Sequence, residues 1–133
     1  RKFLEHLLKH ICFNLEVKTN FRFNEINEKR MPDELINELK SIINKKSSEL
    51  KIKLPVIDRV ANSNILANLL SHDNPFNAKM GDLKAFWDDI NNLEDLFFCK
   101  DDSCCSLVST KYYDNVENKI RCSCGKISYD WAK

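Results

Sequence analysis

The sequence has 133 residues, 43% of them hydrophobic, which is enough to bury one core of ordinary size and a small appendage. Its 21 basic and 20 acidic residues leave a formal net charge of +1, so any contact with nucleic acid would depend on a local basic patch. No apolar run approaches the roughly 20 residues of a membrane-spanning helix, and Glu5, His6 and His10 interrupt the apolar N-terminus, unlike a signal peptide. These features predict a cytoplasmic protein with no membrane contact.

Apolar residues at helical spacing begin at the first residues of the chain. They predict a first helix that runs to about Leu15. Because this pattern is already under way at Arg1, without an initiator methionine, we expect the chain to be part of a longer protein. A polar stretch, TNFRFNEINEKR, predicts a loop over residues 19–30. A second helix is predicted over residues 31–46, where Pro32 suits the first turn and lysines suit the last.

Two more helices are predicted before the cysteine-rich end of the chain. The third extends from Pro55 to about His72, where the sequence HDNP stops it. Asp82 is the predicted N-cap of the fourth, whose apolar residues keep helical spacing to Phe97. The four helices together predict a helical bundle over residues 1–98.

The pattern changes after Cys99. The stretches SLVSTKYYD and NKIRCSCGKISYDW are rich in β-branched and aromatic residues, and DNVEN between them is typical of a turn. We therefore expect short strands in a small second unit over residues 99–133. The predicted fold class is mainly α, a four-helix bundle, with a small C-terminal β zinc ribbon.

Five of the six cysteines lie in this second unit. Clustered cysteines in a reducing compartment hold metal more often than they form disulfides. Four residues separate the cysteines of the first pair and one separates those of the second, while the seventeen residues between Cys104 and Cys122 suffice for a hairpin. This spacing is typical of a zinc ribbon, in which a closed set of four thiolates makes the metal structural and not catalytic. The predicted ligands are Cys99, Cys104, Cys122 and Cys124.

Some alternatives remain open at this stage. Cys105 is an alternative ligand to Cys104, although Cys104 gives the more common spacing, with three residues before the hydrophobic Val108. Disulfides in a secreted protein, or unliganded thiols, are the competing interpretations of the cluster. Gly125 supports the ribbon, because the backbone after a second ligand often needs a positive φ. Cys12 lies in the apolar stripe of the first helix and is interpreted as a small core residue.

The segment ANLLSH, residues 67–72, resembles the R-N-x3-H motif of HEPN domains, helical modules of which many are dimeric, metal-independent ribonucleases. The resemblance places the family's asparagine on Asn68 and its histidine on His72, four residues apart and so on one helix face. Ala67 stands where the family has the arginine that neutralises charge on the phosphate. Arg59 does not replace it, since thirteen residues of helix put it about 20 Å away. Asn68 and His72 are therefore only weak catalytic candidates.

A wider resemblance covers nearly the whole chain. The order RKFLEHLLKHIC, FRFNEINEKRMPDELINELK, NLLSHDNP, LEDLFFC and CSCG is similar to the C-terminal region of bacterial ATPases related to structural-maintenance-of-chromosomes (SMC) proteins, some of which serve in anti-phage defence. The resemblance implies an ATPase head elsewhere, since these residues contain no P-loop.

Three functions follow from these patterns. The preferred one is a non-catalytic dimerisation or docking module of an SMC-like ATPase complex, with no catalytic activity of its own and with a protein partner or a second copy as its target. The second is a HEPN-type ribonuclease with a degenerate site. The third is a nucleic-acid-binding zinc ribbon, which is weakly supported because residues 99–133 hold six basic and five acidic side chains.

Overall fold

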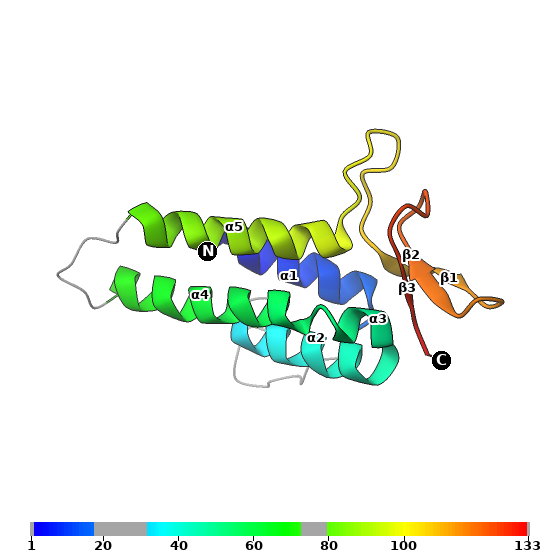
Figure 1. Ribbon diagram of the computed structural model, residues 1–133, viewed down its shortest axis with the longest axis horizontal. Coiled ribbons are helices and arrows are strands. Elements are labelled where there is room, and N and C mark those ends of the chain that lie inside the picture. The colour runs from blue at the N-terminus through cyan, green and yellow to red at the C-terminus, as the bar shows by residue number, and fades with distance from the viewer. Residues whose placement is uncertain (1, 18–31, 73–79, 133) are drawn as a thin grey trace, which may run out of the picture.

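The computed structural model describes residues 2–17, 32–72 and 80–132, with the backbone alone at residues 2, 32–33, 64–72 and 80–83 (Figure 1). Its long helices are α1 (Lys2–Asn14), α2 (Pro32–Lys46), α4 (Leu54–His72) and α5 (Met80–Phe97). They agree with the four predicted helices to within a few residues. The predicted loop over residues 19–30 lies outside the described residues.

Two local predictions need correction. Helix α5 begins at Met80, so Asp82 lies inside its first turn and is not the residue before the helix. A single-turn helix, α3 (Ser48–Lys51), joins α2 to α4 and was not predicted. Four residues are too few to show an apolar period, which is why the sequence pattern does not reveal this helix.

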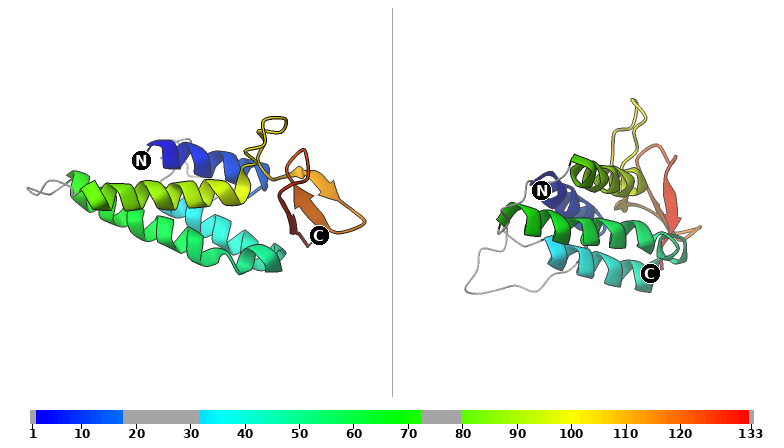
Figure 2. Two further views of the ribbon diagram at one scale, coloured as in Figure 1. Left: turned by 45° about the horizontal axis from the view of Figure 1, so that its top comes forward. Right: turned by 60° about the vertical axis from the view of Figure 1, so that its left-hand side comes forward.

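The helices pack through the apolar stripes that their sequences predict. Helix α4 runs along α5, α2 contacts both α1 and α4, and α1 also contacts α5 (Figure 2). The side chains at the centre are 0% exposed and come from every long helix: Leu4, Leu8, Leu39, Ile43, Ile57, Val60 and Leu93. Truncating one such leucine or isoleucine to alanine costs about 2–5 kcal/mol.

A small antiparallel sheet lies at the end of the helices where α5 finishes (Figure 1). Its strands are β1 (Ser109–Asp114), β2 (Lys119–Arg121) and β3 (Ser128–Asp130), in the order β1-β2-β3. The predicted turn DNVEN joins β1 to β2. Its Asp114 carboxylate accepts the N–H of Val116 at 2.8 Å, and Asn118 takes the left-handed conformation with φ 54°. The expected hairpin between the two cysteine pairs is therefore present.

The sheet packs on the helices and shares their hydrophobic core. Val108, Ile120 and Trp131 belong to the same buried cluster as the leucines of the helices. Tyr129 donates a hydrogen bond from its hydroxyl to the carbonyl oxygen of Leu96 at 2.6 Å. These contacts join residues 1–98 to residues 99–133. Whether each part folds by itself remains a prediction.

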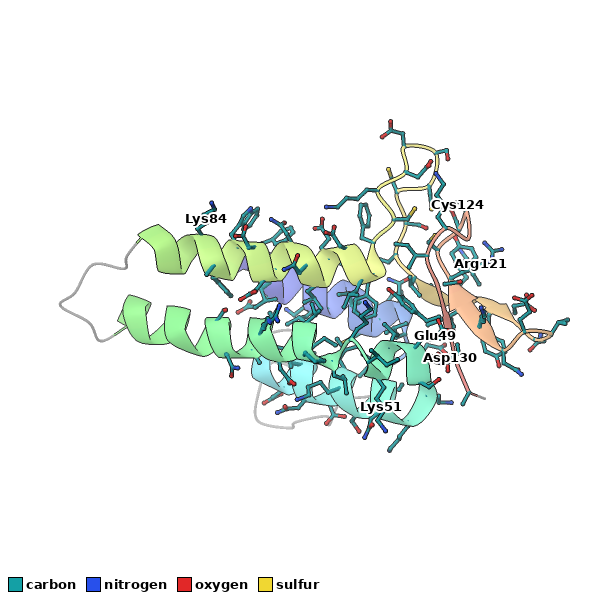
Figure 3. The ribbon with its side chains drawn as sticks, in the orientation of Figure 1. Glu49, Lys51, Lys84, Arg121, Cys124 and Asp130 are labelled. Atoms are coloured by element: carbon teal, nitrogen blue, oxygen red, sulfur yellow. The ribbon has the colours of Figure 1, made fainter. Side chains whose placement is uncertain are left out.

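Asp130 of β3 binds the start of helix α3. Its carboxylate accepts hydrogen bonds from the hydroxyls of Ser47 (3.0 Å) and Ser48 (2.6 Å) and from the N–H groups of Ser48 (2.9 Å) and Glu49 (2.8 Å). Partial burial raises the pKa of Asp130, but these donors outweigh it and lower the pKa to about 2. Figure 3 shows Asp130 beside Glu49. Asp130, near the C-terminal end of the sequence, thus accepts N–H groups at the start of α3, a helix in the middle of the sequence.

Candidate metal centre

The first cysteine pair lies in a loop that closes on itself. Phe98 and Leu107 form an antiparallel bridge at its base, and Cys99 donates its N–H to the carbonyl oxygen of Ser106 at 2.9 Å. At the tip, the N–H of Cys104 donates to the carbonyl oxygen of Asp101 at 2.9 Å. This tight turn brings Cys104 back toward Cys99.

The second pair lies in a shorter loop between β2 and β3. Cys122 donates its N–H to the carbonyl oxygen of Ile127 at 3.0 Å, and Gly125 donates to the carbonyl oxygen of Cys122 at 3.2 Å. Gly125 has φ +83°, a conformation that residues with a side chain rarely adopt. The expected positive φ after the second ligand is confirmed.

The two loops bring four thiols together. The Sγ atoms of the four predicted ligands all lie within 4.8 Å of one another. Cys124 Sγ is 3.6 Å from both Cys99 Sγ and Cys122 Sγ. In a tetrahedral site with Zn–S bonds of about 2.3 Å, the sulfur atoms are about 3.8 Å apart. Sulfur atoms in a disulfide are about 2 Å apart, so these cysteines are free thiols arranged at metal-binding distance.

The remaining cysteines lie outside this cluster. Cys105 directs its Sγ to the carbonyl oxygens of Asp101 (3.4 Å) and Asp102 (3.8 Å), so the structure places Cys104, and not Cys105, with the other three thiols. Cys12 is 5% exposed within the helical core, as predicted. Burial raises its pKa to about 12, which makes it an unreactive thiol.

Hydrogen-bond donors around the cluster favour a thiolate at Cys104. The hydroxyls of Ser106 (3.1 Å) and Ser123 (3.3 Å) contact its Sγ and lower its pKa to about 5. At Cys99 the backbone N–H of Asp101 acts to lower the pKa, but burial and the neighbouring thiols outweigh it and raise the pKa to about 12. Four thiols at this spacing cannot all ionise unaided. A bound divalent cation would offset the repulsion between the four thiolates, because its positive charge stabilises each of them.

Polar contacts hold the two loops against each other. Lys126 of the second loop forms an ion pair with Asp101 of the first, which holds the pKa of that carboxyl well below its usual range. The N–H of Ser123 donates to the Ser106 hydroxyl at 2.9 Å. Arg121 donates to the carbonyl oxygen of Ser123 at 2.6 Å, and Figure 3 shows it near Cys124. Such outer contacts orient metal ligands.

These supporting residues were not predicted from the sequence. Ser106 and Ser123 each lie within two residues of a predicted ligand, and that proximity is the signal that would have found them. Asp101 and Lys126 also each lie two residues from a predicted ligand, but nothing in the sequence indicates that they pair with each other.

The HEPN-like candidates fall at the edge of the described structure. Asn68 and His72 lie in helix α4, so their backbone is helical as predicted. Their side chains, and that of Ala67, lie outside the described residues. Their catalytic role stays a prediction.

Comparison of the chain with protein-family models, with curated proteins and with solved structures finds no match. Within residues 2–17, 32–72 and 80–132, no helix is both long enough and apolar enough to cross a membrane. The cysteine cluster and the surface of the helices are therefore the features from which a function can be inferred.

Proposed function

We propose that this chain is a non-catalytic dimerisation and docking module whose C-terminal part is a zinc ribbon. The observation that carries the proposal is the set of four Sγ atoms within 4.8 Å of one another. Four soft thiolate ligands suit zinc and iron, and zinc is the usual metal of a tetrahedral, fully closed structural site. With four protein ligands there is no position left for water, so the metal stabilises the fold and does no chemistry.

Elemental analysis of protein purified without added metal tests the zinc site. We expect about one zinc per chain, and Cys122→Ser should lose it because Cys122 is a buried member of the cluster. Cys105→Ser is the matched control, since its thiol lies outside the cluster and its loss should leave the zinc in place. A metal-free native protein, or equal loss of zinc in both variants, would contradict the proposal.

The docking part of the proposal rests on exposed aromatic side chains on α1 and α5. Phe3, Phe13 and Trp87 are 42%, 80% and 52% exposed, and we call them the aromatic face. The rings of Phe3 and Trp87 lie 5.5 Å apart, so this part of the face spans both helices. Large aromatic side chains are enriched in protein interfaces.

A second copy of this chain is the proposed occupant of the aromatic face. The formal net charge of +1 means that two copies repel each other only weakly. Sedimentation equilibrium should show a dimer that Trp87→Ser and Phe13→Ser weaken. Ile52→Ser is the control, because Ile52 is 76% exposed but lies in the turn after α3. A monomer at all concentrations would refute self-association.

The resemblance to SMC-like ATPases supplies the proposed context, a complex in DNA maintenance or phage defence, and the HEPN-like bundle supplies the scaffold. The sequence encoded upstream of Arg1 tests it. A P-loop there would support the context, and an unrelated domain would count against it.

One observation favours a nucleic-acid-binding ribbon as a second candidate. Tyr112 on β1 has Lys111 and Arg121 within 6 Å of its ring, at 5.7 and 5.5 Å from the centroid. An aromatic ring beside cations is a common site for stacking bases. Fluorescence anisotropy with labelled single-stranded DNA tests this candidate. Binding should weaken as the salt concentration rises, and Tyr112→Ala should weaken it further.

A further inference from the structure

A pocket of about 290 Å³ lies between helix α1, the end of α5 and the first cysteine loop. Apolar side chains form most of its wall: Phe3, Leu7, Phe98 and Leu107. The pocket is also lined by side chains that bind transition metals: His6, His10, Glu94 and Cys105. None of them belongs to the four-cysteine cluster.

The two histidines are spaced for chelation. His6 and His10 are four residues apart on α1, so their imidazoles project from one face about one turn apart. Both side chains are exposed, and among the described residues neither imidazole has a hydrogen bond or an ion pair. Two histidines at this spacing on one helix can bind one metal ion with both rings, as they do in the H-E-x-x-H motif.

The cysteine loop supplies a third donor from across the pocket. Cys105 has φ 45°, and its exposed side chain lines the pocket, with its Sγ within 3.4 Å of the carbonyl oxygen of Asp101. Glu94 offers a carboxylate on the same pocket. Its neighbour Lys100 lies at 3.6 Å but pairs more closely with Asp95, at 2.7 Å.

We propose that His6, His10 and Cys105 bind a second divalent transition-metal ion, with Glu94 as a further ligand. The mixed imidazole and thiolate donors suit zinc, cobalt or nickel. On binding, the Cys105 thiol loses its proton to solvent and its thiolate bonds to the metal. In the described part of the chain only the four-cysteine cluster has its donors already within 4.8 Å, so these exposed side chains must rotate to close the second site. Such a metal would join helix α1 to the cysteine loop.

Cobalt(II) added to the untagged chain loaded with one equivalent of zinc, which fills the four-cysteine cluster alone, tests this proposal. Zinc holds a given site more tightly than cobalt does, so the four-cysteine cluster keeps its zinc and the cobalt reports the second site. We expect one equivalent of cobalt, with visible d–d absorption and a near-ultraviolet thiolate-to-cobalt charge-transfer band. His6→Ala and His10→Ala should each weaken binding by about tenfold or more. Cys105→Ser should remove the charge-transfer band.

The third histidine gives the matched control. His72→Ala removes an imidazole from α4, distant in sequence from this pocket, and should leave cobalt affinity unchanged. Zinc released from the protein is measured in the filtrate after the protein has been retained by ultrafiltration. The proposal is overturned by any of three results: no cobalt uptake, uptake that releases an equal amount of zinc, or an affinity that His10→Ala leaves unchanged.

Discussion

Replacing Asp130 tests whether the C-terminal strand stabilises the helical part. Asp130→Ala removes the carboxylate that accepts the four hydrogen bonds at the start of α3. A fall in pKa from 3.8 to about 2 corresponds to about 2.5 kcal/mol at full strength, and solvent screening reduces this to about 1–2 kcal/mol. The N-cap of α3 is Ser47, which Asp130→Ala leaves in place, so no further loss of a helix cap is added. We expect a total loss of about 1–2 kcal/mol, or up to roughly 6 °C in Tm for a chain of this size.

The pH dependence separates the charge from other effects of this substitution. Asp130 has a lower pKa in the folded state than in the unfolded state, so its ionisation stabilises the fold above about pH 4, and that contribution is lost as the pH falls toward about 2. The difference between the native chain and Asp130→Asn should therefore shrink over this range. Thermal unfolding followed by circular dichroism at several pH values measures it.

The control is Asp95→Ala, whose carboxylate is 55% exposed and pairs with the exposed Lys100 at the surface. It should change stability by less than about 0.5 kcal/mol. The reasoning is refuted if Asp130→Ala costs no more than this control, or if the effect of Asp130→Asn is as large near pH 2 as at pH 7.

Three further predictions concern the metal centre and the proposed lack of catalysis. Gly125→Ala should cost about 1–2 kcal/mol and release metal at lower chelator concentrations, because a Cβ has room, 3.7 Å from Arg121 Cδ, but alanine is strained at φ +83°; an unchanged chelation midpoint would contradict this. Chelation at low temperature should keep the helical circular dichroism signal and lower the Tm of the whole chain, since the sheet contributes Ile120 to the shared core; an unchanged Tm would show that the two parts are independent. Labelled single-stranded RNA should stay intact with the native chain, and cleavage that disappears in His72→Ala would establish the ribonuclease instead. Activity gained only in Ala67→Arg would indicate a degenerate site.

The helices and the cysteine cluster were predictable because each follows from local patterns. Residues such as Leu4, Leu8 and Ile11 repeat at the helical period, and that repeat alone indicates which face is buried. The spacing of the cysteines likewise indicated which thiols would meet, and it favoured Cys104 over Cys105. The structure agrees, because the Cys105 Sγ is directed to the carbonyl oxygens of Asp101 and Asp102 and not to the other thiols.

The contacts between distant segments were not predictable. The sequence does not show which helical residues the segment 99–133 contacts, and in the structure Trp131 is 5% exposed within the shared hydrophobic core. Asp130 has no sequence signal as a cap for α3, since helix caps are normally found next to the helix they stabilise. A polar residue near the end of a strand is usually interpreted as solvent-exposed, and only the packing of the chain shows otherwise.

The shared core also affects how the chain acquires its structure during synthesis. Leu4 of α1 and Trp131 after β3 belong to one buried cluster, so both segments must have been synthesised before that core can be completed. While the ribosome is still adding the final strands, the apolar faces that receive Val108, Ile120 and Trp131 remain open to water. Contacts between residues this distant in sequence slow folding, because the intervening chain must first close as a loop. The nascent helices are therefore a natural target for chaperones until the cysteine-rich segment emerges and docks.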